Sequence, residues 1–201
     1  MSIHIIGSSG FIGKSLQKKS IGNEEHLFYS SKYENNMKFD INDPNTWKNL
    51  KISKGDKLIF LSWQNLPNYR DDIHIMKNLN KSITFLKEVA KTDISTVVCA
   101  GTCFEYGLQS GCLEESLRTD PVNNYAIAKD TLRRVISNVF DKEKINLAWL
   151  RVFYPYGENQ NPNSLIPLLD KAIRNKEKRF NVSQGDQIRD FIKIEKVAEI
   201  F

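Results

Sequence analysis

Short apolar runs alternate with longer amphipathic segments along most of the chain. Each run has the length of a strand and most of its residues are apolar, as in strands that are covered on both faces. We therefore predict buried strands over residues 2–6, 25–29, 57–61, 95–100 and 146–153. The second of these strands is the least regular, because it contains glutamate and histidine.

The segments between the strands carry apolar residues at helical spacing. Helices are predicted over residues 11–19, 71–91, 125–140 and 165–176. One apolar face of the second helix and one of the third are formed by Ile75, Leu79, Ile83, Leu86 and Ala90, and by Leu132, Val135, Ile136 and Val139. Strands that alternate with helices predict an α/β fold, a doubly wound parallel sheet with helices on both faces. After Gly157 the sequence becomes ENQNPNS, and a different unit is expected to begin there.

Composition and charge narrow the class of protein. The chain has 201 residues, 40% of them hydrophobic and 26% charged, with a net charge of +5. The basic residues are dispersed, and the densest cluster, over residues 174–179, contains an acid, so we expect a solvated surface and no nucleic-acid partner. A basic surface still favours an anionic substrate.

Cysteine usage and the chain start indicate the compartment. Cys99, Cys103 and Cys112 are odd in number and form no ligand pattern with histidine, so neither a disulfide framework nor a metal site is expected. The first residues lack the features of a signal peptide, and no apolar run has membrane-spanning length. These features predict a cytoplasmic protein without a membrane partner.

A glycine-rich loop follows the first predicted strand. It reads GSSGFIG, from Gly7 through Ser9, Gly10, Phe11 and Ile12 to Gly13. Glycines there permit a tight turn and close approach of the backbone to a pyrophosphate, which the start of the following helix attracts. A purely structural turn is the alternative, but the position between a strand and a helix favours dinucleotide binding.

The end of the second strand bears on the choice of cofactor. An acid at this place favours NAD through the ribose hydroxyl, whereas a basic residue favours the 2′-phosphate of NADP. The sequence has Ser31 and Lys32 here and no acid. We therefore favour NADP(H), with NAD(H) possible; a surface lysine without a role is the alternative.

Tyr125 and Lys129 lie one helical turn apart near the start of the third long helix. A free tyrosine has a pKa of about 10, and a cation on the same helical face stabilises the phenolate. Such a pair suits proton transfer, although an exposed pair without a role has the same spacing.

The ordered motifs together resemble the extended short-chain dehydrogenase/reductases, the NAD(P)-dependent sugar-nucleotide epimerase, dehydratase and reductase family. The matching motifs, in chain order, are GSSGFIG, Asp40-Ile41, FLSW ending at Trp63, GTCFEYG at 101–107, Tyr125-xxx-Lys129, LRVFYPYG at 150–157 and QIRDFI at 187–192. The resemblance implies a Rossmann dinucleotide-binding domain over 1–157 and a partial, truncated substrate-binding region over 158–201. Members usually run to about 300 residues, as two-part folds often do.

The resemblance also implies residue roles. Tyr125 is expected to be the catalytic acid/base, with Thr102 as its hydroxyl partner and Lys129 bonding the nicotinamide ribose and lowering the tyrosine's pKa. The remaining expected contacts are Asp40, Ile41, Leu61, Ser62 and Trp63 to the cofactor, and Tyr154, Asn163 and Arg189 to the substrate, Arg189 at its diphosphate.

Three functions stay open. Cys103 and Phe104 replace the Asp-Glu pair that the family's dehydratases carry, which leaves a keto-sugar reductase or a 4-epimerase. Tyr154 stands where epimerases often have Asn, and this favours the reductase, acting on a nucleoside-diphosphate sugar in polysaccharide or deoxysugar biosynthesis. The alternative from another class is a catalytically silent NADP(H)-binding protein. A homodimer is expected through residues 71–91 and 125–140, by analogy with the family.

Overall fold

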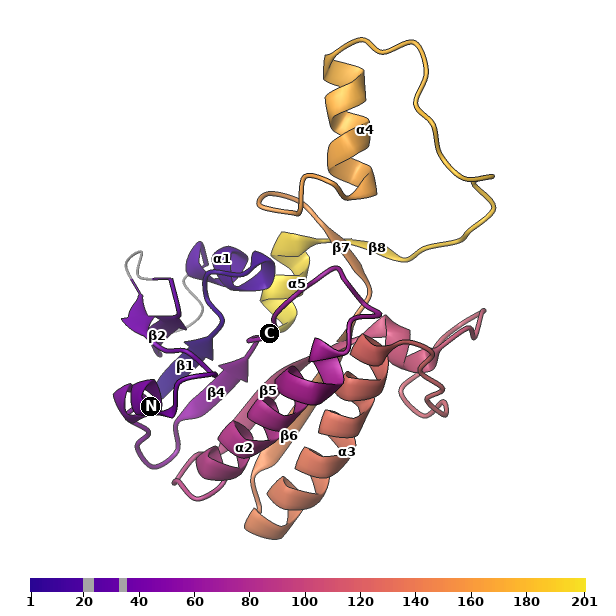
Figure 1. The fold of residues 1–201 in the computed structure, drawn as a ribbon. Coiled ribbons are helices and arrows are strands. Elements are labelled where there is room, and N and C mark those ends of the chain that lie inside the picture. Colours follow the sequence, from indigo (N-terminus) through magenta and orange to yellow (C-terminus); the bar gives the residue numbers. More distant parts are fainter. Residues whose placement is uncertain (20–23, 33–35) are drawn as a thin grey trace.

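Six parallel strands form one sheet in the order β3-β2-β1-β4-β5-β6 (Figure 1). The computed structural model describes residues 1–19, 24–32 and 36–201. The strands are β1 (Ser2–Ile6), β2 (Glu25–Ser30), β3 (Met37–Lys38), β4 (Lys57–Phe60), β5 (Thr96–Thr102) and β6 (Asn146–Val152). The order reverses between β1 and β4, and in doubly wound sheets such a switch point marks the ligand crevice. The predicted fold class is confirmed.

Helices cover both faces of this sheet. On one face lie α2 (Asn80–Val89), α3 (Asn124–Glu143) and the 3₁₀ helix η1 (Pro44–Asn49), and on the other lie α1 (Phe11–Gln17) and α5 (Ile194–Ile200). The Phe85 ring of α2 contacts three other rings in the larger core. The centroids of Phe39, Trp47 and Phe60 lie 5.1, 5.2 and 5.7 Å from the Phe85 centroid. Burial of these large rings dominates the stabilisation of that face.

The segment predicted as one helix over 71–91 is divided in the structure. A π-helix, η2 (His74–Leu79), precedes α2. His74 and Asn78 are buried, and the Asn78 amide donates to the Gln64 carbonyl at 3.0 Å. Apolar periodicity does not detect this widened turn, because two of its buried residues, His74 and Asn78, are polar.

Several short elements were not expected from the sequence. Four of them, among the described residues, are β3, η1, β7 (Tyr154–Tyr156) and β8 (Phe191–Lys193). The 3₁₀ helix η1 starts because the Asp43 carboxylate accepts from the Asn45 N–H at 3.1 Å. The other three have two or three residues each, too few for an alternating pattern.

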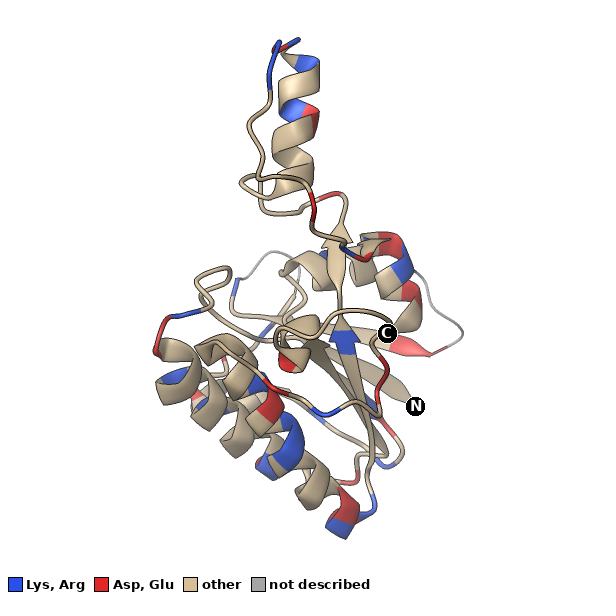
Figure 2. Cartoon of the chain, turned by 90° about the vertical axis from the view of Figure 1, so that its right-hand side faces the viewer, with Lys and Arg blue, Asp and Glu red and all other residues tan. Residues whose placement is uncertain are grey.

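The last part of the chain leaves the sheet and returns to it. Strands β7 and β8 pair in parallel, and between them α4 (Leu165–Arg174) projects away from the rest of the molecule (Figures 1 and 2). Helix α5 then packs against α1, so that Ala198 joins Ile5 and Leu16 in the smaller core. The division at residue 157 stays a prediction. Figure 2 also shows acidic and basic residues intermixed along the helices.

Candidate active site

The glycine loop lies at the switch point of the sheet. Gly7 has φ +88°, and its N–H donates to the Tyr29 carbonyl at 3.0 Å, which turns the chain beside the end of β2. A Cβ on Gly13 would lie 2.5 Å from the Gly7 carbonyl oxygen, so only glycine fits where α1 crosses the loop. Gly10 is exposed and precedes α1, whose first N–H groups receive no side-chain cap. Free N–H groups at a helix start suit a pyrophosphate, and the contact of this loop with the dinucleotide stays a prediction.

The loop also contacts the end of β2. The Ser30 hydroxyl donates to the Ser9 hydroxyl at 2.7 Å, and Phe11 and Ile12 begin α1 half-buried. Ser31 and Lys32 follow β2 and are exposed. The Lys32 backbone N–H donates at 3.0 Å to the same Ser30 hydroxyl that bonds Ser9.

Asp40 and Ile41 follow β3 at the same edge of the sheet. The Asp40 carboxylate accepts from the Asn42 backbone N–H at 2.8 Å, and Ile41 is buried in the larger core. Asp40 thus shapes the turn that follows β3, and its adenine contact stays a prediction.

Leu61, Ser62 and Trp63 continue β4 on the other side of the switch point. A Cβ on Gly7 would lie 2.9 Å from the Leu61 carbonyl carbon and the Ser62 nitrogen, so the two strand ends are in backbone contact. Trp63 then turns its ring towards α3, where the ring centroid lies 4.1 Å from the Lys129 Nζ. The predicted cofactor residues after β1 and after β4 therefore lie side by side at the switch point of the sheet.

Thr102, Tyr125 and Lys129 meet at the carboxyl end of β5. Thr102 ends the strand, and α3 places Tyr125 in its first turn, where the Asn123 side chain accepts from the Ala126 N–H at 2.9 Å. Lys129 follows one turn later and donates to the Ala100 carbonyl at 2.9 Å. The three side chains are 6%, 8% and 3% exposed, so this is a buried cluster and not an exposed pair.

The pKa of Tyr125 departs from the prediction. Burial raises the pKa of Tyr125 above its usual range, nearby Tyr69 adds to the effect, and the Thr102 side chain opposes it. The predicted lowering by Lys129 is not found in this structure, because the Lys129 ammonium is directed to Ala100 and the Trp63 ring. Burial likewise lowers the pKa of Lys129 to about 8.

An aromatic wall around Tyr125 was missed by sequence reasoning. The rings of Trp63, Tyr69 and His74 lie 5.9, 5.6 and 5.4 Å from the Tyr125 ring, centroid to centroid. The Trp63 Nε1 donates to the His74 Nδ1 at 3.0 Å, and the His74 Nε2 bonds the Asn68 carbonyl at 3.0 Å. No motif signals Tyr69 or His74, since they come from the loop and π-helix after β4.

The predicted substrate residues are only partly brought together. The Arg189 guanidinium donates to the Tyr154 hydroxyl and lies 4.6 Å from the centroid of the Tyr154 ring. That ring also contacts Phe104, at a centroid distance of 6.3 Å, so the pair adjoins the turn that follows Thr102. Asn163 is exposed in the loop before α4, where its N–H bonds the Asn161 side chain.

The Cys103 thiol lacks the properties of a catalytic nucleophile. Burial raises the pKa of the Cys103 thiol to about 11, which keeps it protonated at neutral pH and argues against a nucleophile. Over residues 1–19, 24–32 and 36–201, no group of three or more His, Cys, Asp or Glu residues is arranged to hold a metal ion. Within the same ranges no helix is long and apolar enough to span a membrane.

A switch-point glycine cradle beside a buried Thr-Tyr-Lys set defines a dinucleotide-dependent enzyme of the short-chain dehydrogenase/reductase type. Residues 3–201 match the model of the NAD dependent epimerase/dehydratase family, and the chain belongs to this family. The resemblance predicted from the motifs is confirmed, as is the class of enzyme.

Named relatives agree with this placement. The chain is 28% identical to a dTDP-6-deoxy-L-talose 4-dehydrogenase (NAD(+)) of Aggregatibacter actinomycetemcomitans, over 98% of this chain and 77% of that protein. It is 27% identical to a GDP-6-deoxy-D-talose 4-dehydrogenase of the same organism, over 100% of this chain and 68% of that protein.

Solved structures share the fold. A UDP-glucose 4-epimerase of Thermotoga maritima superposes with a TM-score of 0.85 at 19% identity, over 99% of this chain and 71% of that one. A UDP-N-acetylglucosamine 4-epimerase of Methanobrevibacter ruminantium superposes with a TM-score of 0.80 at 22% identity, over 98% of this chain and 70% of that one.

Proposed function

We propose that the chain is an NAD(P)-dependent oxidoreductase of nucleoside-diphosphate sugars that interconverts a sugar hydroxyl and a ketone. The observation that carries the proposal is the buried cluster of Thr102, Tyr125 and Lys129 beside the glycine cradle. Two relatives whose names describe 4-dehydrogenases of nucleotide-linked 6-deoxytaloses support a nucleoside-diphosphate 6-deoxyhexose as the substrate class.

The raised pKa of Tyr125 suits the reductive direction. A phenol that holds its proton at neutral pH is ready to donate that proton to a carbonyl oxygen. The dinucleotide, when bound, supplies the hydride that the carbonyl carbon accepts, so the ketone becomes a hydroxyl. Thr102 orients the substrate oxygen, and its hydrogen bond to Tyr125 stabilises the phenolate that remains. The oxidative direction reverses each step.

Substrate binding is proposed for Arg189 and Tyr154. The guanidinium is exposed and held on the Tyr154 ring, a geometry that presents its planar donors to a diphosphate. Asn163 is retained as a third contact, in the loop before α4. A 4-epimerase is the second candidate, favoured by the epimerases among the structures that share this fold.

Cofactor choice is proposed to depend on Lys32. The family description and the name of one relative specify NAD, whereas the exposed Lys32 beside the glycine loop favours the 2′-phosphate of NADP(H). We expect NADPH affinity to fall about tenfold in Lys32→Ala while NADH affinity stays within about twofold. The control is Lys38→Ala, an exposed lysine of β3. Equal effects on both cofactors would remove Lys32 from the proposal.

Turnover tests the catalytic assignment. Wild type is assayed for NAD⁺- and NADP⁺-dependent oxidation of dTDP-, GDP- and UDP-linked 6-deoxyhexoses and for reduction of the 4-keto forms. Tyr125→Phe is expected to lose at least about 10³-fold in kcat with unchanged cofactor affinity. Full activity in Tyr125→Phe would reject the assignment. Cofactor binding without any turnover in wild type would favour a silent dinucleotide-binding protein.

A further inference from the structure

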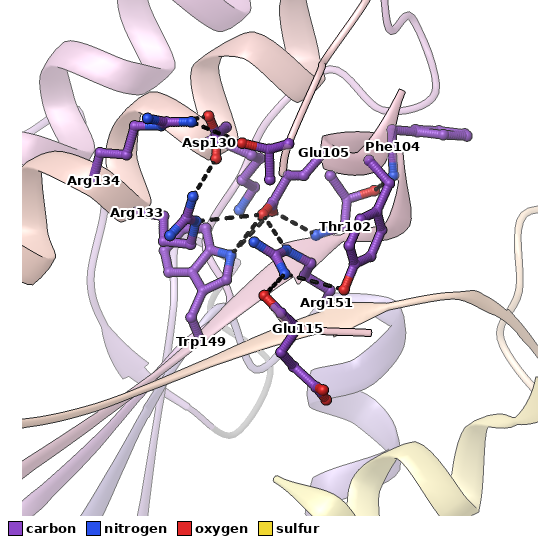
Figure 3. Close-up of polar contacts among 12 residues, drawn as sticks. Thr102, Phe104, Glu105, Glu115, Asp130, Arg133, Arg134, Trp149 and Arg151 are labelled. Atoms are coloured by element: carbon purple, nitrogen blue, oxygen red, sulfur yellow. Dashed lines mark hydrogen bonds and ion pairs between the residues drawn. The ribbon is translucent and has the colours of Figure 1, made fainter. Parts of the chain in front are cut away.

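We propose that Glu105 is a positioning residue of the catalytic set: its buried carboxylate fixes the turn that presents Thr102 and places a negative charge at the strand end that Lys129 bonds (Figure 3). The role in turnover rests on the proposed function. The contacts and the charge are properties of the folded chain, and they are testable without a substrate.

Glu105 fixes Thr102 at the start of a turn that a second hydrogen bond, from Phe104, closes. The Thr102 N–H donates to the Glu105 Oε1 at 2.9 Å, and the Thr102 hydroxyl accepts from the Phe104 N–H at 3.3 Å. Together they form a capping box at the start of the 3₁₀ helix η3 (Cys103–Tyr106). Because the hydroxyl accepts from the backbone here, its own hydrogen and second lone pair are left to face Tyr125 or a substrate.

The carboxylate is fully buried and its charge is compensated from other elements. Its oxygens accept from the Trp149 Nε1 at 3.0 Å and the Arg151 Nε at 2.9 Å, both on β6. The Arg133 Nε of α3 lies 3.8 Å away and has no hydrogen-bond partner among the described residues. Figure 3 shows these side chains converging on Glu105 from the strand and the helix.

Such a buried ion cluster has a desolvation cost that an apolar residue at this position would avoid. A capping turn alone needs no buried ion pair, since a neutral acceptor satisfies the Thr102 N–H. The charge itself therefore calls for a function beyond the turn. The nearby catalytic lysine provides one.

Lys129 and Glu105 both form hydrogen bonds with the backbone at the end of β5. Lys129 donates to the carbonyl of Ala100, and Glu105 accepts from the N–H of Thr102, two residues later. Between them Gly101 has no room for a side chain, because a Cβ there would lie 2.8 Å from the Glu105 Oε1. Burial lowers the pKa of Lys129 to about 8, and Cys99 on β5 and then the Glu105 charge act against this lowering. The carboxylate thus helps to keep a buried ammonium protonated.

A titration of Lys129 tests the charge without a substrate. Protein labelled with ¹³C at lysine Cε is titrated by NMR, and the Lys129 signal is assigned by its loss in Lys129→Arg. Glu105→Gln keeps the shape and is expected to lower the titration midpoint by at least about 0.5 pH unit. Glu115→Gln is the matched control, because its side chain is exposed and only its backbone carbonyl meets Arg151. An unchanged midpoint in Glu105→Gln would overturn the proposal.

Kinetics test the positioning role. In Glu105→Gln, kcat is expected to fall at least about tenfold while the KM for the dinucleotide stays within about twofold. In the pH profile of kcat, the limb that reports Tyr125 is expected to move to lower pH in Glu105→Gln. The reason is that the Glu105 charge, which the variant lacks, raises the pKa of Tyr125. A wild-type kcat and profile would contradict the positioning role. If wild type turns over no sugar nucleotide, the proposed function fails, while the Lys129 titration still decides the role of Glu105.

A second variant covers the case in which Glu105→Gln does not fold. Glu105→Asp keeps the charge and withdraws the carboxylate from Thr102. The Thr102 amide is then expected to exchange with solvent at least about tenfold faster, with the Lys129 midpoint retained. Unchanged protection of the Thr102 amide would overturn the proposal.

Discussion

The Lys129 ammonium lies beneath the ring of Trp63, with Nζ 4.1 Å from the ring centroid. A hydrogen bond from the Trp63 Nε1 to His74 at 3.0 Å holds the ring in this place. The Trp63 side chain, which follows β4, therefore packs on Lys129 and Tyr125, although the sequence assigned it only to the cofactor. Its contact with the lysine makes the tryptophan a reporter of the site.

Trp63→Phe should weaken NAD⁺ binding by about threefold to tenfold. The smaller ring keeps an aromatic face but loses the bond to His74 and part of a cation–π attraction of roughly 1 kcal/mol. The variant should also lose most of the change in tryptophan emission on addition of cofactor. Trp47→Phe, in the core beside Phe85, should retain that change. A full emission response in Trp63→Phe would contradict this placement of the ring.

Lys129→Met should reveal that this buried lysine lowers the stability of the fold at neutral pH. The folded pKa of Lys129 is lowered from 10.5 to about 8, so the unfolded chain holds this proton more tightly. Between pH 8 and 10.5 the unfolded state binds more protons, and wild-type stability therefore gains with rising pH, by about 3 kcal/mol in total. The stability of the variant does not rise in this way. At pH 7 the variant avoids the cost of a buried ammonium, but it also loses the hydrogen bond to Ala100, which offsets part of that benefit.

Urea unfolding of both proteins at pH 7 and pH 10 measures this difference. Subtracting the two curves cancels the other titrating groups. Lys87→Met, an exposed lysine on α2, should show no such change between the two pH values. A constant difference between wild type and Lys129→Met would argue that the ammonium is as well solvated as in the unfolded chain.

The sequence predicted the sheet, its covering helices and the residues of the crevice, because these depend on local patterns. Apolar runs identify buried strands, and the spacing of Tyr125 and Lys129 reflects one helical turn. Buried polar groups from distant segments lie outside such patterns. His74 and Glu105 show this, since each is 0% exposed and each finds its partners through the tertiary fold. The direction of the Tyr125 pKa was missed for the same reason, since burial of the phenol outweighs the lysine in the same helix.

Gly13→Ala should abolish NAD⁺ binding and destabilise the fold by about 2 kcal/mol or more. The added Cβ would lie 2.5 Å from the Gly7 carbonyl oxygen and 2.6 Å from the Ser8 Cα, and both are backbone atoms that cannot rotate away. Gly10→Ala is the matched comparison, because its Cβ would meet only the Gly7 oxygen, at 3.2 Å. We expect a smaller loss there, of about 1 kcal/mol or less. Equal urea midpoints for the two variants would contradict the close crossing of α1 over the loop.

Asp56→Asn should destabilise the fold by about 2–4 kcal/mol at pH 7, at the end of the sheet opposite the crevice. Burial alone would raise the pKa of Asp56, but backbone hydrogen bonds from Ser2 and Ser53, each 2.8 Å long, and a bond with His4 at 3.1 Å lower it. Because the folded pKa lies below the unfolded value of 3.8, this stabilisation is complete above that value and is lost as the pH falls through the folded pKa. The difference between wild type and variant should therefore be constant near neutrality and shrink below about pH 4. Urea unfolding from pH 3 to pH 7 measures it, with the exposed Asp93→Asn as control. A difference that does not depend on pH would show that the carboxylate is retained for its shape and not for its charge.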